Sequence, residues 1–236
     1  MESPARETIA QRVQSVLSAI RSAAEKAGRR PDDIRLVAAT KTVTADRIRE
    51  GIGAGLSILG ENRVQEALPK IEALAQAPVQ WHFIGHLQRR KVRSVAGMFE
   101  LIHSVDSLEL AQEIDRRAGE AGRPQDILLE VNIGGETTKA GFHPDGLIQL
   151  VSMMASLSHI QIKGLMAIPP PTTEAESART YFVRLRKLAE AIAVQRIPGV
   201  TMNELSMGMS NDYEIAVQEG ATLVRVGSAV FGARHA

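Results

Sequence analysis

The chain has 236 residues, 44% of them hydrophobic, and its 28 Lys and Arg residues against 27 Asp and Glu residues give a formal net charge of +1. This length suits one large core, and a balanced charge without long runs of one sign leaves no footprint for nucleic acid or an anionic membrane. The sequence has no cysteine, which excludes disulfides, thiolate metal sites and a cysteine nucleophile.

The first predicted element is a long amphipathic helix over residues 5–27, which ends at Gly28. No stretch of the chain approaches the ~18 apolar residues of a membrane helix, and the first residues lack the apolar core of a signal peptide. We therefore expect a cytoplasmic protein with a single domain over residues 1–236.

After this helix, short apolar runs rich in Val and Ile alternate with longer amphipathic stretches, which is the pattern of repeated βα units. The runs predict eight strands, at residues 34–40, 56–59, 79–84, 101–105, 127–133, 160–168, 202–206 and 222–226. The stretches between them predict helices, among them residues 45–54, 61–75, 107–121, 174–193 and 211–219. Eight such units can close into a barrel, whereas an open sheet needs a switch point. We predict a single-domain (β/α)8 TIM barrel with an extra N-terminal helix.

Small residues follow the seventh and eighth predicted strands, where barrels commonly hold phosphate. Ser210 lies in the loop after the seventh strand, while Gly227 and Ser228 follow the eighth. Serine hydroxyls can donate to phosphate oxygens, and a glycine lets a ligand approach the backbone closely. Each residue alone fits an ordinary turn or cap, but their joint placement favours a phosphate site.

Arg225 lies inside an otherwise apolar strand, between Val224 and Val226, which point to the opposite face. A guanidinium in a barrel interior carries a large desolvation cost unless it is paired. Two partners are open at this point: an internal carboxylate such as Glu130, or a heteroaromatic ring nitrogen of a ligand beside the phosphate site.

Lys41 comes at the end of the first predicted strand, which neighbours the eighth once the barrel closes. A partly desolvated ammonium at this rim can lose its proton and form an imine with an aldehyde. The alternative is a solvated surface lysine, since a free ammonium prefers water.

Other candidates have two interpretations each. Asn62 caps the helix that follows it or contacts a cofactor, and His82 is a core histidine or a cofactor contact. Met207 and Met209 pack on a cofactor ring or fill space at the rim. His82 and His86 are four residues apart but do not share a helical face, so we expect no metal site.

Several segments, in order along the chain, carry a family resemblance. They are residues 36–41 (LVAATK), 60–66 (GENRVQE), 81–91 (WHFIGHLQRRK), 130–133 with Lys139 and Gly141, 164–168 (GLMAI), 205–212 (LSMGMSND) and 224–232 (VRVGSAVFG). The chain resembles the pyridoxal 5′-phosphate (PLP) homeostasis proteins, formerly called proline synthase co-transcribed, which are similar to the barrel domain of alanine racemase. It departs from the usual family pattern at Arg63, where an aromatic residue is common, and at Arg89-Arg90, where Ser-Asn is common.

The resemblance implies that Lys41 holds PLP as an internal aldimine, that Ser210, Gly227 and Ser228 bind its phosphate, and that Arg225 faces the pyridine nitrogen. Because arginine has no acceptor, a ring nitrogen opposite it accepts a hydrogen bond and stays unprotonated, which weakens the ring as an electron sink. Alanine racemase adds a second domain and a partner tyrosine base, whereas this sequence ends four residues after Gly232. We expect little or no turnover for lack of that second acid or base.

Three functions remain open on these residues. The first is a non-catalytic, monomeric PLP binder that stores the cofactor or delivers it to apo-PLP enzymes, and so acts indirectly on amino-acid and keto-acid balance. The second is a small racemase-like PLP enzyme acting on amino acids. The third is a phosphosugar-type barrel enzyme that uses Lys41 to form an imine. The first is favoured by the resemblance.

Overall fold

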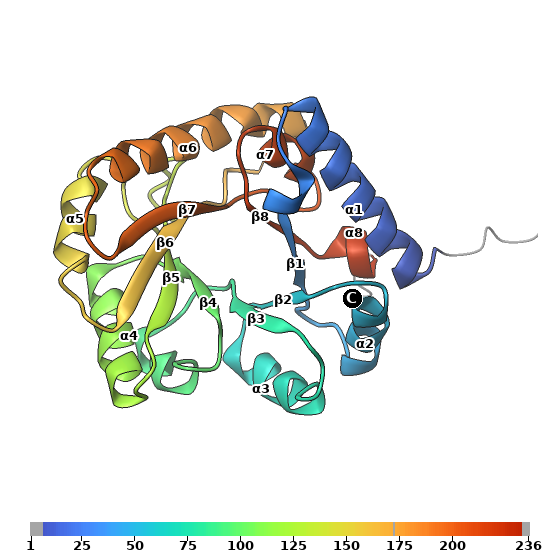
Figure 1. Ribbon diagram of the computed structural model, residues 1–236, viewed down its shortest axis with the longest axis horizontal. Coiled ribbons are helices and arrows are strands. Elements are labelled where there is room, and N and C mark those ends of the chain that lie inside the picture. The colour runs from blue at the N-terminus through green and yellow to red at the C-terminus, as the bar shows by residue number, and fades with distance from the viewer. Residues whose placement is uncertain (1–6, 172, 233–236) are drawn as a thin grey trace, which may run out of the picture.

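The computed structural model describes residues 7–171 and 173–232, and in this part of the chain eight parallel strands form a closed barrel in the order β1 to β8 (Figure 1). The predicted (β/α)8 barrel is therefore confirmed. The strands are β1 (Arg35–Ala39), β2 (Ile58–Glu61), β3 (Gln80–Phe83), β4 (Leu101–Val105), β5 (Gln125–Glu130), β6 (Ile160–Met166), β7 (Val200–Ser206) and β8 (Leu223–Val226). Each overlaps a predicted strand.

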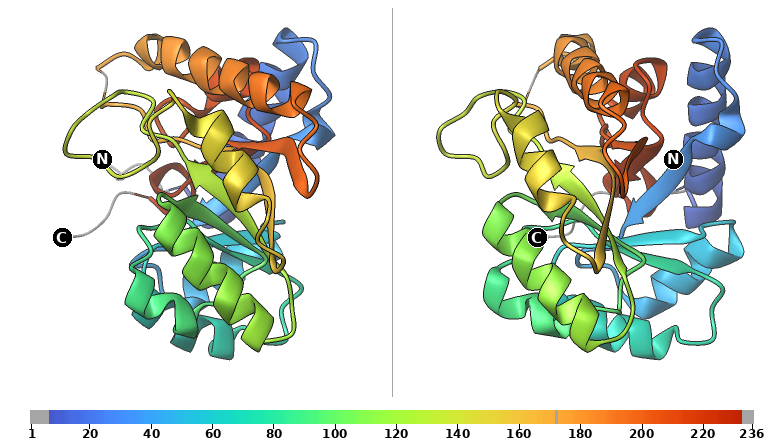
Figure 2. Two further views of the ribbon diagram at one scale, coloured as in Figure 1. Left: turned by 90° about the vertical axis from the view of Figure 1, so that its left-hand side faces the viewer. Right: turned by 60° about the vertical axis from the view of Figure 1, so that its left-hand side comes forward.

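Helices surround the strands on the outside of the barrel (Figures 1 and 2). The α-helices are α1 (Ile9–Lys26), α2 (Ala45–Gly53), α3 (Val64–Ala73), α4 (Leu108–Glu120), α5 (Leu147–Met154), α6 (Arg179–Val194), α7 (Tyr213–Gln218) and α8 (Ser228–Phe231). Short 3-10 helices are η1 (Pro31–Asp33), η2 (Arg89–Ser94) and η3 (Ala175–Ala178). The long segment between β5 and α5 extends outward from the barrel (Figure 2).

Two boundaries and one helix differ from the sequence-based expectations. The N-terminal helix begins at Ile9 behind a capping box formed by Thr8 and Gln11, and residues 5 and 6 of the expected range lie outside the described residues. The helix expected from residue 61 begins at Val64, because Glu61 ends β2 as a fully buried residue. The helix α5 was not among those expected.

The core has two layers. A small apolar cluster fills the barrel interior, and a larger one lies between the strands and the surrounding helices. The interior cluster consists of Val37, Ile58, Ile84, Leu101, Leu128, Met166 and Leu223. Strands β6 and β7 approach each other closely at Gly164, where an added Cβ would lie 1.8 Å from the carbonyl oxygen of Glu204. Only glycine fits there without a shift of the backbone.

The barrel closes where the first and last strands pair. The register runs from Arg35 opposite Leu223 to Ala38 opposite Val226. This pairing brings the C-terminal end of β1 beside the C-terminal end of β8. Helix α1 packs against α2, α7 and α8 and covers this junction (Figure 1).

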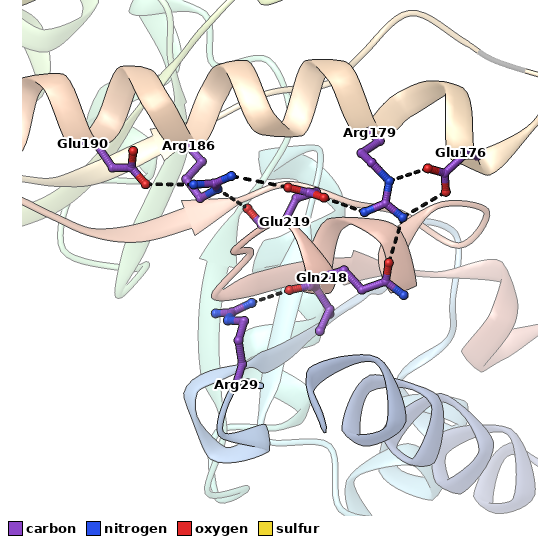
Figure 3. A network of polar contacts seen from close by, with 8 residues as sticks. Arg29, Glu176, Arg179, Arg186, Glu190, Gln218 and Glu219 are labelled. Carbon is purple, nitrogen blue, oxygen red and sulfur yellow. Dashed lines mark hydrogen bonds and ion pairs between the residues drawn. The ribbon is translucent and has the colours of Figure 1, made fainter. Parts of the chain in front are cut away.

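A network of arginines and carboxylates ties α7 to its neighbours (Figure 3). Arg179 and Arg186 of α6 both pair with Glu219, at 2.5 and 3.5 Å, and Arg186 also donates to the Glu219 carbonyl at 3.1 Å. From the segment after α1, Arg29 donates to the Val217 carbonyl at 2.5 Å. These contacts hold α7, and with it the loop that connects β7 to α7.

Candidate functional site

Lys41 lies two residues after β1, above a buried ion pair. Thr40 is fully buried, and its hydroxyl donates to Oε1 of Glu61 at 2.6 Å. The ammonium of Lys70 donates to the same oxygen at 2.6 Å and to the carbonyl of Thr40 at 2.7 Å. These bonds fix the backbone immediately before Lys41, so the position of the lysine depends on packing against α3 as well as on β1.

The loops after β7 and β8 meet around the hydroxyl of Ser210. This oxygen accepts from the backbone N–H groups of Gly227 and Ala229, both at 3.4 Å. Bonds of this length are weak, so an anion could displace the hydroxyl and take both donors at shorter distance. An added Cβ at Gly227 would lie 3.3 Å from Ala39, which shows how little room a side chain would have.

Asp212 holds the first of these loops. Its Oδ1 accepts from the backbone N–H of Met209 at 2.6 Å. Burial raises the pKa of Asp212, although this hydrogen bond and the charge of Arg225 act in the opposite direction. At Gly208 the φ angle is +90° and an added Cβ would lie 2.5 Å from the Cβ of Ala216, so the turn requires glycine.

Arg225 is 5% exposed and points into the barrel, as the alternation along β8 predicts. Its guanidinium donates to Ser206 Oγ at 2.5 Å and to the carbonyl of Ala167 at 3.0 Å. No ion pair joins it to Glu130 or to any other carboxylate in residues 7–171 and 173–232, so the internal salt bridge considered above is wrong for this structure. Burial lowers the pKa of Arg225 to about 10, against the charges of Glu130 and Asp212, and the group stays protonated at neutral pH.

One cavity of about 490 Å³ brings these groups together. Five of the residues singled out from the sequence line it: Lys41, Ser210, Arg225, Gly227 and Ser228. Met209 lines it as well, at 37% exposure, and the prolines from Pro169 to Pro171 form part of its wall. The cavity therefore has a lysine, a buried guanidinium and two loops with backbone donors on a single surface.

A second cavity of about 420 Å³ shares Lys41 with the first. Asn62 lines it, together with Arg63, His86 and Lys91. The described structure gives Asn62 no capping bond to α3, and its buried Oδ1 has no hydrogen-bond partner there. The role as a helix cap is therefore not supported by the described structure, and contact with a ligand stays a prediction.

Two predicted site residues are not brought to either cavity. Met207 is fully buried in the main apolar cluster, where it fills space. His82 is 2% exposed and lines a different cavity, of about 370 Å³, at the N-terminal end of the strands. A direct contact of His82 or Met207 with a ligand beside Lys41 is therefore not supported.

Three lining or supporting groups escaped the sequence analysis. Lys139, which pairs with Glu136 at 2.5 Å, lines the main cavity from the long segment after β5. The backbone N–H of Ala229 and the hydroxyl of Ser206 were also missed. Lys139 is one of the residues that carry the family resemblance, so the sequence could have predicted it as a site residue. The position of a backbone N–H group cannot be predicted from residue types.

Among the described residues, no helix is long and apolar enough to cross a membrane, and no group of three or more His, Cys, Asp or Glu residues is arranged to hold a metal ion.

Comparisons with known proteins give a consistent result. The model of the alanine racemase N-terminal domain matches residues 13–235. A pyridoxal phosphate homeostasis protein of Aquifex aeolicus is 46% identical over 224 residues, which are 95% of this chain and 97% of that protein. The Escherichia coli K12 protein of the same name is 40% identical over 96% of this chain and 97% of its own.

Solved structures agree with these matches. PipY of Synechococcus elongatus PCC7942 with PLP bound has a TM-score of 0.84 and 39% identity, and covers 95% of this chain and 100% of its own. An alanine racemase of Clostridium difficile, with a TM-score of 0.69 and 14% identity, shares the fold over 95% of this chain and 56% of that one. The chain is thus a barrel of the alanine racemase N-terminal type. Within that class it belongs to the family of pyridoxal phosphate homeostasis proteins.

Proposed function

We propose that this protein binds PLP in the cavity beside Lys41, through an imine between Lys41 and the cofactor aldehyde, and acts in PLP homeostasis as a store or donor without appreciable turnover. The observation that carries the proposal is the meeting of Lys41, Arg225 and the two phosphate-type loops on one cavity surface. Relatives that are 40% and 46% identical bear the homeostasis name, and a relative of 39% identity has been solved with PLP.

The residues present fit the cofactor. A volume of about 490 Å³ lies within the range of roughly 300–1,000 Å³ that is usual for small-molecule sites. The phosphate would accept hydrogen bonds from the backbone N–H groups of Gly227 and Ala229. In this structure both groups donate to the Ser210 hydroxyl at 3.4 Å. Ser228 would add a hydroxyl, and Lys139 a nearby positive charge.

Arg225 would face the ring nitrogen. Of its five N–H donors, one goes to Ser206 and one to Ala167, which leaves three, and Arg225 lines the cavity. A permanent donor at this position keeps the ring nitrogen unprotonated. The bound cofactor supplies an electrophilic aldehyde carbon and a ring that can withdraw electrons, and this chain would leave the second property weak.

The racemase-like alternative requires a second acid or base at the cavity. Tyr181 and Tyr213 are the two tyrosines of the chain, both within the described residues, and neither lines the cavity. Tyr213 is instead a buried residue at the start of α7. Besides Lys41, the cavity has Lys139 and Asp212 as groups that can transfer a proton, and these are held by Glu136 and by the backbone N–H of Met209. The lack of a tyrosine at the cavity supports binding without turnover as the first choice.

The decisive experiment is covalent mapping of the imine. Purified protein is mixed with PLP, its visible absorption is recorded, the imine is reduced with borohydride, and the modified lysine is identified by peptide mass spectrometry. We expect the label on Lys41, loss of the visible band in Lys41→Ala, and no change in Lys187→Ala, a matched change on the exposed face of α6. Labelling spread over several lysines would refute the proposed site, and the absence of an imine band would favour a phosphosugar-type enzyme.

Turnover is tested separately with the PLP-loaded protein and single amino acids. We expect racemisation, decarboxylation and transamination to be negligible, because loss of one acid or base group alone costs about 10²- to 10⁴-fold in rate. A kcat of roughly 1 to 10³ per second for any amino acid would instead establish the racemase-like alternative.

A further inference from the structure

A chain of buried polar side chains crosses the barrel interior and ends at Arg225. Its members are His82 on β3, His103 on β4, Ser206 on β7 and Arg225 on β8, all between 0% and 5% exposed. Nδ1 of His82 lies 2.9 Å from Nε2 of His103, and Nδ1 of His103 lies 2.8 Å from Ser206 Oγ, which accepts from Arg225 at 2.5 Å. Polar groups this deep are costly unless every donor finds an acceptor.

The positions of the protons along this chain follow from Arg225. A guanidinium only donates, so the Ser206 oxygen accepts, and its own single hydrogen must find another partner. The acceptor within reach in the described structure is Nδ1 of His103, at 2.8 Å. His103 then carries its proton on Nε2 and donates it to Nδ1 of His82. His82 in turn carries its proton on Nε2.

The opposite order is less favourable. If His103 donated from Nδ1, Ser206 would accept twice and its hydrogen would have no partner among the hydrogen bonds of the described residues. A positive charge on His103 would also lie near Arg225 and Arg35, and one on His82 near Arg35. Burial, supported by these neighbouring charges, lowers the pKa of His82 to about 3 and that of His103 well below its ordinary value, so both rings are neutral.

We propose that His103, held by His82 and acting through Ser206, is a positioning residue that fixes the guanidinium of Arg225 against the ring nitrogen of the cofactor. The proposal rests on the proposed function of the cavity. Two carboxylates, Glu130 and Asp212, attract Arg225 electrostatically but form no ion pair with it in the described structure. If His103 no longer oriented Ser206, Arg225 would keep one oriented acceptor in the barrel interior, the Ala167 carbonyl, and would turn toward these carboxylates and away from the ring.

The other end of the chain is open. His82 lines the cavity of about 370 Å³ at the N-terminal end of the strands, where Gln80 and Glu204 are among the polar residues. Nε2 of His82 therefore belongs to the end of the chain that lies beside this cavity, whereas the hydrogen bonds from His82 to Arg225 lie in the barrel interior. His82 and His103 thus connect the cavity at the N-terminal end of the strands to Ser206 and Arg225 beside the main cavity, and both histidines are neutral.

The first test needs no cofactor. Two-bond ¹⁵N–¹H couplings of ¹⁵N-labelled protein report the tautomer of each histidine. We expect His82 and His103 both as neutral Nε2–H tautomers at neutral pH, with His103→Gln and His159→Leu used for assignment. His159 is an exposed histidine paired with Asp115, and it serves as the matched control. An Nδ1–H tautomer at His103 would overturn the proton order, and with it the proposal.

The second test separates positioning of Arg225 from general damage. Affinity for PLP is compared with affinity for the carbocyclic analogue that lacks the ring nitrogen, in wild type, His103→Leu, His103→Gln and His159→Leu. We expect His103→Leu to weaken PLP about tenfold, the analogue less than about twofold, and His103→Gln to restore part of the loss, because an amide can still accept from Ser206.

Equal weakening of PLP and the analogue, or no weakening of either, would overturn the positioning role. If His103→Leu does not fold, His103→Gln and the wild-type tautomers still decide the question. If wild-type protein binds neither PLP nor the analogue, the proposed function fails, and that outcome is distinct from a failure of the histidine chain, which the couplings report independently.

Discussion

Removal of one partner from the ion pair of Glu61 and Lys70 should cost far more stability than the loss of an ordinary surface pair. The Glu61 side chain is 0% exposed and that of Lys70 12%, and the two atoms are 2.6 Å apart. In Lys70→Met the carboxylate of Glu61 stays buried, and its Oε1 keeps one hydrogen bond, from the hydroxyl of Thr40. Removal of one partner of a buried pair costs about 3–5 kcal/mol, so we expect the free energy of unfolding to fall by that amount.

The assay is urea unfolding followed by the fluorescence of Trp81, the single tryptophan of the chain, which is 7% exposed. The matched control is Arg63→Met. Arg63 is 76% exposed and lies 3.6 Å from Glu66, so its loss should cost less than about 1 kcal/mol. The double variant Glu61→Gln with Lys70→Met should recover most of the lost stability, because neither charge is then left alone.

Two results would refute this reasoning. One is a Lys70→Met variant within about 1 kcal/mol of wild type, which would mean that the pair behaves as an exposed one. The other is a double variant no more stable than the single one, since the cost would then come from lost packing of the lysine stem. Because Lys70 also bonds the carbonyl before Lys41, PLP affinity should fall together with stability in Lys70→Met.

Further predictions concern the cavity and the interior. Ser210→Ala with Ser228→Ala should weaken PLP by roughly 1.5–3 kcal/mol for each hydrogen bond lost to the phosphate, and equal affinity of wild type for pyridoxal and PLP would show that the phosphate site is misplaced. Arg225→Glu should shift the visible spectrum of bound PLP by favouring a protonated ring nitrogen; an unchanged spectrum at full occupancy would contradict contact with the ring. Because burial lowers the pKa of His82 from 6.5 to about 3, the unfolded state binds more protons in this window. The free energy of unfolding should therefore fall as the pH drops from about 6.5 toward 3, by up to about 1.4 kcal/mol per pH unit for this histidine. If the decline is equally steep in His82→Gln, other groups cause it.

The barrel was predictable because each strand is a compact apolar run between amphipathic stretches. The start of α3 was not predictable, because glutamate is a common helix residue, whereas Glu61 ends β2 and its side chain is bonded to Lys70 and Thr40. Local propensity gives no information about a partner nine residues away that approaches from another element.

The meeting of Lys41 with Ser210, Gly227 and Ser228 followed from strand order alone, since neighbouring strands end at the same rim. The roles of these residues in binding PLP stay predictions. The position of His82 could not be predicted in this way, because the alternation along a strand indicates which face a side chain takes but not its depth along the barrel axis. The position of His82 at the N-terminal end of the strands, and its bond to His103, required the three-dimensional register of β3 and β4.

The junction of β1 and β8 makes the cavity depend on two segments that are far apart in the chain. Lys41 is synthesised well before Arg225 and Gly227, so a nascent chain that ends between them has the lysine without the phosphate loops. Strand β8 pairs with β1 at four positions. A ligand bound to Lys41 on one side and to Gly227 on the other would bridge these two strands. Its binding free energy would add to the cost of separating β1 from β8, so a bound cofactor would favour chains in which both strands are paired and would protect them from unfolding.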